Sequence, residues 1–314
     1  MALPERPPMT RSLPVDAPAS ATYHSVFRPG LMAGRVVLVT GGGSGIGRCT
    51  AHELANLGAD LALLGRKLEK LLAVQAEISQ ALPQARISLH VCDIREEEAV
   101  RAAVGQVLAQ HGRIDGLFNN AGGQFPAPLR DISQKGWETV VRNNLTGGFL
   151  MARECYTQWM EAHGGAVVNI IADMWHGMPG MGHSGAARAG MLNLTETAAC
   201  EWAASGVRVN AVAPGWVASS GLDTYPEDFK NRIRQLARKV PLQRLATEAE
   251  VSAAVVFLLS DAAAFITGTT LRVDGGVPNA KHTWALPAHR NSRPYNGFAL
   301  AQPPAFLDTD ETPS

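Results

Sequence analysis

A run of glycines near the N-terminus, set between an apolar segment and a helical one, limits the fold more than any other feature of this chain. Residues 35–40 form a short β-branched run that predicts a strand, and residues 45–57 have helical periodicity. Between them, residues 41–47 contain five glycines, which permit a tight turn and let backbone N–H groups approach a ligand closely. A helix N-terminus adds unpaired N–H donors and a positive dipole. This order of strand, loop and helix predicts a pyrophosphate-binding loop, with a turn that binds nothing as the alternative.

Apolar runs and helical segments alternate through the middle of the chain. The predicted strands are residues 35–40, 60–64, 87–92, 114–118, 166–171, 207–212 and 270–273, and the predicted helices are residues 45–57, 68–80, 96–110, 137–160 and 187–204. Buried strands that alternate with helices indicate a doubly wound parallel α/β sheet, a Rossmann fold, in a single domain. Such a sheet binds ligands at the carboxyl ends of its strands.

Two proline-containing segments flank the predicted domain, which spans residues 33–277. Residues 1–32 are expected to form an irregular N-terminal arm, and residues 278–314 an irregular C-terminal tail, because neither has the periodicity of a packed domain. Either segment can still pack over the core or on a partner subunit.

The charge balance argues against some classes of partner. Lys and Arg together number 28, as do Asp and Glu, so the formal net charge is zero. This balance disfavours nucleic acid or an anionic membrane as the main partner. No segment has the roughly 18 uninterrupted apolar residues of a membrane span, and the N-terminus lacks a signal-peptide pattern. The four cysteines are far apart, as expected for reduced thiols in a cytoplasmic protein, and the histidines lack metal-ligand spacing, so no metal site is predicted.

The end of the second predicted strand bears on the choice of dinucleotide. NAD-binding proteins usually place a carboxylate there, which accepts hydrogen bonds from the ribose 2′-hydroxyl. Here Arg66 and Lys67 follow the strand, so two cations stand where a 2′-phosphate would lie. Arg48, at the start of the helix after the glycines, is a further candidate. The chain is therefore predicted to bind NADP rather than NAD; in the alternative, Arg66 and Lys67 only begin a solvated helix.

Motifs along residues 33–277 resemble those of the short-chain dehydrogenase/reductase family. The glycine-rich loop looks like the family's cofactor loop, and Pro214-Gly215 resembles the segment beside the nicotinamide. Further matches are Asn119-Asn120-Ala121-Gly122, Asn143-Asn144-Leu145-Thr146, Ile266-Thr267-Gly268 and Val273-Asp274-Gly275-Gly276. Within the family, residues 122–125 and 183–190 are similar to peroxisomal trans-2-enoyl-CoA reductase and dienoyl-CoA reductases.

The resemblance implies a set of cofactor contacts and a mode of assembly. The implied cofactor-binding residues are Gly41, Ser44, Gly45, Ile46, Gly47, Arg66, Lys67, Asp93, Ile94, Asn120, Ala121, Gly122, Arg188, Pro214, Gly215 and Val217. The implied partners are a small-molecule substrate, an acyl thioester or an alcohol, and further copies of the chain. Many relatives form homotetramers through the helices equivalent to residues 137–160 and 187–204, and the same is expected here.

The chain departs from the family at the positions that usually carry the chemistry. Most members have a tyrosine and a lysine four residues apart on the helix after the fifth strand; here Ser184 and Arg188 occupy those places. The usual serine is replaced by Ala172, and of the four usual residues only Asn144 remains. The predicted catalytic residues are therefore Asn144, Ser184, Arg188 and the neighbouring His183.

This departure favours one reaction class over another. A serine hydroxyl is a much weaker acid than a tyrosine, whose pKa is about 10, so it is a poor proton donor for an alkoxide. Reduction of an enoyl thioester instead places charge on the thioester oxygen, which needs hydrogen-bond donors more than a full proton transfer. The leading hypothesis is an NADPH-dependent trans-2-enoyl-CoA reductase. The alternatives are a dehydrogenase of alcohols or 3-oxoacyl thioesters in fatty-acid or terpenoid breakdown, and a non-catalytic dinucleotide-binding scaffold.

Several residues are candidates for contacts with substrate. Gln124 and Phe125 follow the fourth strand, and Asp173, Trp175 and His176 follow the fifth. Residues 216–242, called the lid below, match the substrate-covering region of the family, and Tyr225 within it is an additional candidate proton donor. The lid cations Arg234, Arg238 and Lys239 are candidates for CoA phosphates, with a solvated helix surface as the alternative.

Overall fold

The computed structural model describes residues 22–280 and 285–307, and its centre is a parallel sheet of seven strands in the order β3-β2-β1-β4-β5-β6-β7. The strands are β1 Val36–Thr40, β2 Asp60–Gly65, β3 Ile87–Val91, β4 Gly116–Asn119, β5 Gly165–Ile170, β6 Val207–Pro214 and β7 Thr270–Val273. All six neighbouring pairs are parallel, so the predicted doubly wound α/β fold is confirmed. The order reverses between β1 and β4, which is where such sheets bind ligands.

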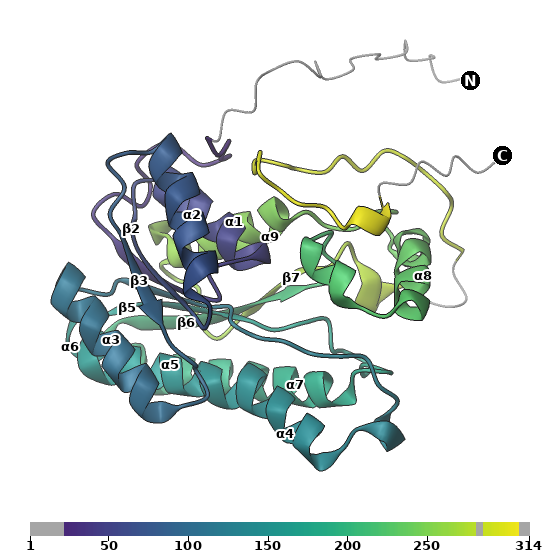
Figure 1. The fold of residues 1–314 in the computed structure, drawn as a ribbon, viewed down its shortest axis with the longest axis horizontal. Helices are drawn as coiled ribbons and strands as arrows, with labels where there is room; N and C mark the ends of the chain where they lie inside the picture. The colour runs from purple at the N-terminus through teal and green to yellow at the C-terminus, as the bar shows by residue number, and fades with distance from the viewer. Residues whose placement is uncertain (1–21, 281–284, 308–314) are drawn as a thin grey trace, which may run out of the picture.

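The sheet lies between two layers of helices (Figure 1). Helices α1 Gly45–Asn56, α2 Leu68–Ala81 and α9 Glu248–Leu259 cover one face, and α3 Glu97–His111, α5 Gly147–Cys155 and α7 Gly182–Glu201 cover the other. Every residue of β1 and β4 is buried, because these central strands are covered on both faces. Shorter helices are α4 Gln134–Val141, α6 Glu161–His163 and α8 Glu227–Leu236.

The long helix expected over residues 137–160 differs from the prediction. Helix α4 begins three residues earlier, at Gln134, because Ser133 Oγ accepts the backbone N–H of Gly136 and so caps the helix. The helical path then passes through two π-helical turns, Arg142–Thr146 and Tyr156–Met160. Such turns are rare and are found mostly at functional sites, and the first one carries Asn144.

Three other differences from the predicted elements have physical reasons. Helix α7 begins at Gly182 rather than at residue 187. Its first turn was not predicted, because it contains glycines, which have low helix propensity. Helix α8 was not predicted, because its sequence is mostly polar, and α9 was not predicted, because it is apolar nearly all round.

Among the described residues, no helix is long and apolar enough to cross a membrane.

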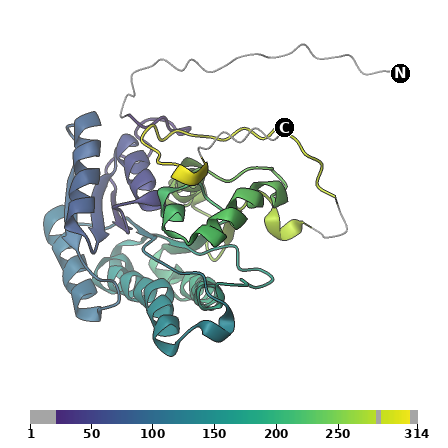
Figure 2. The same cartoon turned by 45° about the vertical axis from the view of Figure 1, so that its right-hand side comes forward.

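The C-terminal segment 285–307 crosses the outside of the helical layer and ends against α8 (Figures 1 and 2). Phe298 is buried against Tyr23, and Leu300 O accepts a hydrogen bond of 3.1 Å from Arg48 Nη1. A final short 3₁₀ helix, Ala305–Leu307, packs on the lid through Phe306. The segment is irregular, as expected, and it joins the core rather than extending from it. Residues 22–32 of the predicted arm pack on the domain through the buried Tyr23 and Met32. Residues 1–21, 281–284 and 308–314 lie outside the described residues.

Candidate active site

The glycine-rich loop has the backbone that its sequence requires. Gly41 and Gly45 have φ values of +65° and +56°, in the left-handed region that favours glycine. A Cβ at Gly47 would lie 2.3 Å from Gly41 O, so only glycine allows α1 to approach the loop this closely. Ser44 precedes the helix in an extended conformation and its side chain makes no capping hydrogen bond. The first turn of α1, which includes Ile46, therefore offers its N–H groups to a ligand.

A cavity of about 200 Å³ lies beside this loop, at the carboxyl ends of β2, β3 and β4. Its lining includes the predicted residues Gly41, Ser44, Arg66, Lys67, Asp93, Ile94, Ala121 and Gly122. Asp93 is held by Arg95, whose guanidinium donates hydrogen bonds to both carboxylate oxygens and lowers the pKa of Asp93 to about 2. Asp93 is therefore a fixed anion at the end of β3.

Lys70, which is exposed, also lines this cavity. A Cβ at Gly43 would lie 2.9 Å from Lys70 Cβ, so the first turn of α2 lies directly against the glycine-rich loop. Arg66 and Lys67 precede α2 and Lys70 lies in its first turn, so the fold, not a helical spacing, brings the three side chains together. Three cations consequently surround one cavity.

Arg48, in contrast, is a structural residue, which corrects its assignment as a phosphate contact. Its guanidinium donates hydrogen bonds of 2.8 and 3.0 Å to the carboxylate of Glu77 on α2. It also binds the carbonyl of Leu300 in the C-terminal segment and lies over the ring of Phe298. The side chain is buried, is not part of the cavity lining, and joins α1, α2 and the C-terminal segment.

The turn after β4 is held by side-chain hydrogen bonds. Thr40 Oγ1 accepts the backbone N–H groups of Asn120 and Ala121, each at 2.9 Å, and Asn120 Nδ2 donates to Thr40 O at 3.0 Å. Asn144 Nδ2 donates to Gly123 O at 2.8 Å, and Asn144 Oδ1 accepts the Gly123 N–H at 2.9 Å. Both polar ends of the Asn144 amide thus fix the backbone beside Gly122.

Arg188 lies under this turn, between the ends of β4 and β5. Its Nη1 donates a hydrogen bond of 2.5 Å to Ile170 O, and a Cβ at Gly122 would lie 2.7 Å from its Nη2. Burial lowers its pKa to about 10, so the guanidinium is still charged at neutral pH. Nε is buried and, among the described residues, has no hydrogen-bond partner. An unsatisfied buried donor on a cation indicates that a bound group completes this site.

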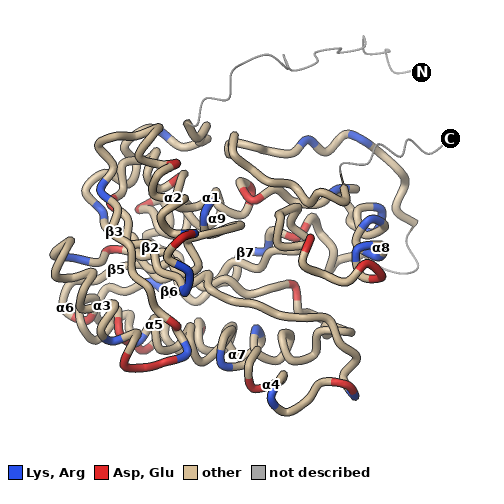
Figure 3. Tube along the Cα trace, viewed as in Figure 1, with Lys and Arg blue, Asp and Glu red and all other residues tan. Residues whose placement is uncertain are grey.

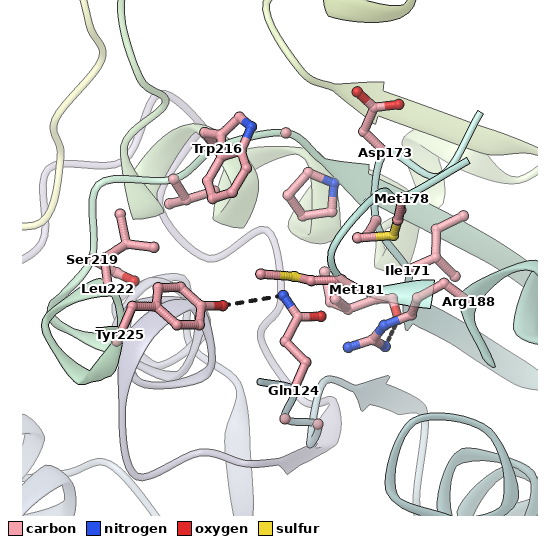
Figure 4. A pocket seen from close by; sticks show the side chains of 18 of the residues that line it. Gln124, Ile171, Asp173, Met178, Met181, Arg188, Trp216, Ser219, Leu222 and Tyr225 are labelled. Atoms are coloured by element: carbon pink, nitrogen blue, oxygen red, sulfur yellow. Dashed lines mark hydrogen bonds between the residues drawn. The ribbon is translucent and has the colours of Figure 1, made fainter. Parts of the chain in front are cut away.

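A second cavity, of about 650 Å³, extends from this point toward the lid (Figure 4). The predicted cofactor residues Ile46, Gly122, Arg188, Pro214, Gly215 and Val217 line one part of it. Its other walls are mostly apolar and come from the loop after β5 and from the lid; they are Met178, Pro179, Met181, Trp216, Leu222, Tyr225 and Phe229. A sequence pattern could not identify the two methionines or Trp216 as wall residues, since their loops have no regular period.

A hydrogen-bonded chain of three side chains joins α7 to the lid. Ser184 Oγ donates to Gln124 Oε1 at 2.5 Å, and Gln124 Nε2 donates to Tyr225 Oη at 3.2 Å. Gln124 and Tyr225 line the large cavity, whereas Ser184 is fully buried behind Gln124 and is not part of the lining. The hydroxyl at the position where the family usually has tyrosine therefore orients a glutamine.

The structure places several predicted site residues outside the large cavity. His183 is buried, accepts the Ser184 N–H through Nδ1 and contacts the ring of Phe125 edge-on at 4.5 Å. Neither His183 nor Phe125 lines the cavity. Trp175 packs under Arg272, with the guanidinium 5.7 Å from the ring centroid, and His176 is exposed with a φ of 70°. Tertiary packing, which the sequence pattern does not contain, separates these residues from the chain Ser184–Gln124–Tyr225.

Asp173 does line the large cavity, as expected. Burial and the charge of Asp274 raise its pKa, while Arg272 and His176 act in the opposite direction. Figure 4 shows its carboxylate directed away from Gln124 and Arg188. Its Oδ1 is buried and, among the described residues, has no hydrogen-bond partner.

Lys and Arg residues gather on α8 in the lid, beside an acidic first turn (Figure 3). Arg234 is held within the protein, since it bonds Glu227 at 3.1 Å and donates to Phe306 O at 3.3 Å. Arg238 and Lys239 are exposed and do not line the large cavity. Their proposed contact with CoA phosphates stays a prediction.

The family model described as Enoyl-(Acyl carrier protein) reductase matches residues 41–278, which span the glycine-rich loop, both cavities and all strands after β1. The chain belongs to the short-chain dehydrogenase/reductase family. It is therefore an oxidoreductase that uses a nicotinamide dinucleotide. Members of this family act on small molecules, as the apolar cavity beside the cofactor residues also indicates.

Several short-chain dehydrogenases/reductases are similar to this chain over most of its length. A peroxisomal 2,4-dienoyl-CoA reductase of Danio rerio is 34% identical over 87% of this chain and 92% of its own. The levodione reductase of Leifsonia aquatica is 37% identical, over 77% and 93% of the two chains. The solved structure of a citronellol catabolism dehydrogenase from Pseudomonas aeruginosa is 57% identical, with a TM-score of 0.73 and coverage of 82% of this chain and all of that one.

The residues present fit a nicotinamide dinucleotide. The glycines leave room for a pyrophosphate, the Arg188 Nε finds no partner within the described part of the chain, and the two cavities meet at Gly122. The fit has one departure from the family pattern, because a charged guanidinium replaces the usual lysine ammonium at position 188. Arg188 retains a positive charge and hydrogen-bond donors at that place.

Proposed function

We propose that this short-chain dehydrogenase/reductase reduces the C=C bond of a trans-2-enoyl thioester with NADPH. The observation that carries the proposal is the position of Ser184. It replaces the usual tyrosine acid, and its hydroxyl is buried and donated to Gln124 rather than directed into the cavity. A site built this way lacks the family's usual donor for a carbonyl oxygen, whereas conjugate reduction does not require that donor.

The apolar walls of the large cavity support an acyl substrate. Met178, Met181, Trp216 and Leu222 offer an apolar surface next to the cofactor residues. The cavity volume of about 650 Å³ would be shared between the nicotinamide and an acyl chain. A bound nicotinamide would supply a hydride to this cavity. Arg188 would hold the nicotinamide ribose through its charged donors, and Asn144 would keep the Gly122–Gly123 backbone in position beside it.

We propose NADP rather than NAD because three cations stand at the end of β2 and the start of α2, and no acidic residue directly follows β2 at positions 66–68. Asp93, which also lines the cavity, is already paired with Arg95. Arg66, Lys67 and Lys70 all line the cavity beside the glycine-rich loop. A ribose 2′-phosphate placed among them would form charge-assisted hydrogen bonds, to which Arg66 contributes a planar, two-pronged donor.

A tetrameric assembly and a cytoplasmic location are retained as predictions.

A second candidate is the oxidation of a terpenoid alcohol. It is favoured by the 57% identity with the citronellol catabolism dehydrogenase, which is higher than the identity with the dienoyl-CoA reductase. This reaction needs a proton acceptor in place of the missing tyrosine. The apolar cavity suits a branched hydrocarbon chain in either reaction.

The two candidates are separated by an assay with purified protein. Reduced nicotinamide is followed by absorbance while NADPH is mixed with trans-2-enoyl-CoA esters of several chain lengths, including branched ones. Parallel reactions contain 3-oxoacyl-CoA, citronellal, or citronellol with NADP⁺. The proposal expects turnover with the enoyl esters. Turnover with the terpenoids alone would replace it with the second candidate, and cofactor binding without any turnover would favour a non-catalytic scaffold.

The cofactor proposal makes a separate prediction for Arg66 and Lys70. Each of the variants Arg66→Ala and Lys70→Ala removes one cation from the 2′-phosphate, so each should raise the Kd for NADPH about tenfold, as expected for loss of a charge-assisted hydrogen bond worth about 1.5 kcal/mol. The Kd for NADH should change less than threefold. Binding is measured by the fluorescence of the reduced nicotinamide.

Arg130→Ala is the matched control. It also removes one exposed cation, but Arg130 lines neither of the two cavities. Equal losses of NADPH and NADH affinity in the Arg66 and Lys70 variants would show that these cations do not face a 2′-phosphate.

A further inference from the structure

The large cavity contains one phenol, the side chain of Tyr225. The chain has four tyrosines, and the other three are engaged elsewhere in the described structure. Tyr23 and Tyr295 lie in the cluster that joins the first described residues to the C-terminal segment 285–307, where Tyr23 Oη donates to Glu53. Tyr156 bonds Ser205 and stacks on Trp202 at 4.3 Å. Of the four tyrosines, all of which are described, Tyr225 is the one that lines the space between the cofactor residues and the lid.

The hydrogen bonds around Tyr225 leave its own proton available to the cavity. Its oxygen accepts the N–H of Gln124 at 3.2 Å, and the Gln124 amide is held in that orientation because Ser184 donates to its oxygen. Figure 4 shows the Tyr225 hydroxyl and the Gln124 amide facing each other within the cavity. An amide N–H directed at a phenol oxygen stabilises the negative charge that develops when the phenol gives up its proton.

The lid holds the Tyr225 ring in place. The ring contacts Phe229 at 5.0 Å and belongs to a cluster with Leu222, Ile233 and Phe306. Tyr225 is only half-buried, so water can return a proton to it. The ring is thus positioned by packing while its hydroxyl stays in contact with both the cavity and solvent.

The other candidate acids are placed less favourably. Ser184 is fully buried and its proton is donated to Gln124, while His183 and His176 lie outside the lining. Asp173 lines the cavity, but its carboxylate is directed away from Gln124 and Arg188 (Figure 4).

We infer that Tyr225, supplied by the lid rather than by α7, is the proton donor of this enzyme, and that Ser184 and Gln124 position it. This inference rests on the proposed reaction class. A hydride, with its electron pair, adds to the β-carbon of the enoyl thioester, and the π electrons move to give an enolate. The Tyr225 O–H bond breaks as a new C–H bond forms at the α-carbon, and the tyrosinate regains its proton from water. In total, one hydride and one proton are added across the C=C bond.

The test compares Tyr225→Phe with Tyr156→Phe, which removes a hydroxyl far from the cavity. Tyr225→Phe should lower kcat about 100-fold or more, since general acids typically contribute at least that factor. KM and the NADPH Kd, measured by fluorescence, should stay within threefold of the natural chain. Tyr156→Phe should leave kcat within threefold. The assay uses whichever compound the natural enzyme turns over. A failure of the enoyl-thioester assignment is therefore detected independently of the result for Tyr225.

The positioning role of Ser184 is tested by a double-mutant cycle. Ser184→Ala frees the Gln124 amide and should lower kcat about tenfold, whereas the same change made on top of Tyr225→Phe should lower it less than twofold, because the group it positions is already gone. A kcat for Tyr225→Phe within threefold of that for Tyr156→Phe would overturn the inference. The inference would also be overturned if Ser184→Ala lowered kcat by the same factor in the natural chain and in Tyr225→Phe.

Discussion

At the scale of single residues, burial sets the charge of groups that surround the glycine-rich loop. Glu248, at the start of α9, is buried, and its Oε1 would lie 3.9 Å from a Cβ placed at Gly45. Burial raises the pKa of Glu248 to about 7, against the opposing effect of Arg48. A carboxyl that stays protonated at mildly acidic pH places little negative charge beside the loop that is proposed to receive a pyrophosphate.

This raised pKa predicts how stability depends on pH. In the unfolded chain Glu248 ionises near pH 4.5, and in the folded chain near pH 7, so its contribution to stability is complete below pH 4.5 and is lost as the pH rises through 7. Relative to Glu248→Gln, which does not ionise, the free energy of unfolding of the natural chain should fall by about 2 to 3 kcal/mol between pH 5 and pH 8.

Urea denaturation of both proteins at several pH values measures this difference. Every other titrating group is shared by the two proteins, so it cancels in the comparison. Stability curves that stay parallel from pH 5 to pH 8 would contradict the raised pKa.

At the scale of elements, the C-terminal segment supports the lid. Phe306 packs with Leu222 and Ile233, Ala305 N–H is accepted by Asp223, and Arg234 donates to Phe306 O. The elements that carry Tyr225 are therefore held from outside by a segment about 80 residues further along the chain. Removal of this support should loosen the lid while leaving the sheet intact.

We expect Phe306→Ala to raise amide hydrogen exchange in residues 220–236 at least tenfold, because it removes a buried ring from the small cluster under the lid. Exchange in β1 and β4 should not change. Mass spectrometry of peptides from each segment measures both. Phe265→Ala is the control, since Phe265 is fully exposed. Unchanged exchange in the lid, or equal changes in lid and sheet, would show that the segment does not hold the lid.

The elements also show what a sequence can and cannot predict in this fold. The central strands were predictable because a strand buried on both faces is a continuous apolar run, as in β1 and β5. Helix α9 is apolar nearly all round, so no periodicity marks it, whereas α8 carries Phe229, Ile233 and Leu236 at helical spacing within a mostly polar segment and was missed. In the candidate site, the glycine-rich loop and Arg66 are local features and were identified from sequence. The contact of Gln124 with Tyr225 joins residues 101 positions apart, and only the folded structure brings them together.

At the scale of the whole molecule, the fold separates the two tasks of the proposed enzyme. The β1–β4 side of the sheet holds the glycine-rich loop and three cations, and the β5–β6 side holds the large cavity that the lid helps to line. The cavities meet at Gly122, above Arg188 and Asn144. A hydride donor bound on one side can therefore reach an acyl group bound on the other.

The most direct test of this account is the fate of the transferred hydride. The enzyme is supplied with NADPH that carries deuterium at the transferred position of C4, together with a trans-2-enoyl-CoA and citronellal in equal amounts. The products are analysed by mass spectrometry and NMR. The account predicts deuterium on carbon 3 of a saturated acyl chain, with the thioester intact. Deuterium on the carbinol carbon of citronellol, with the enoyl thioester unchanged, would contradict it.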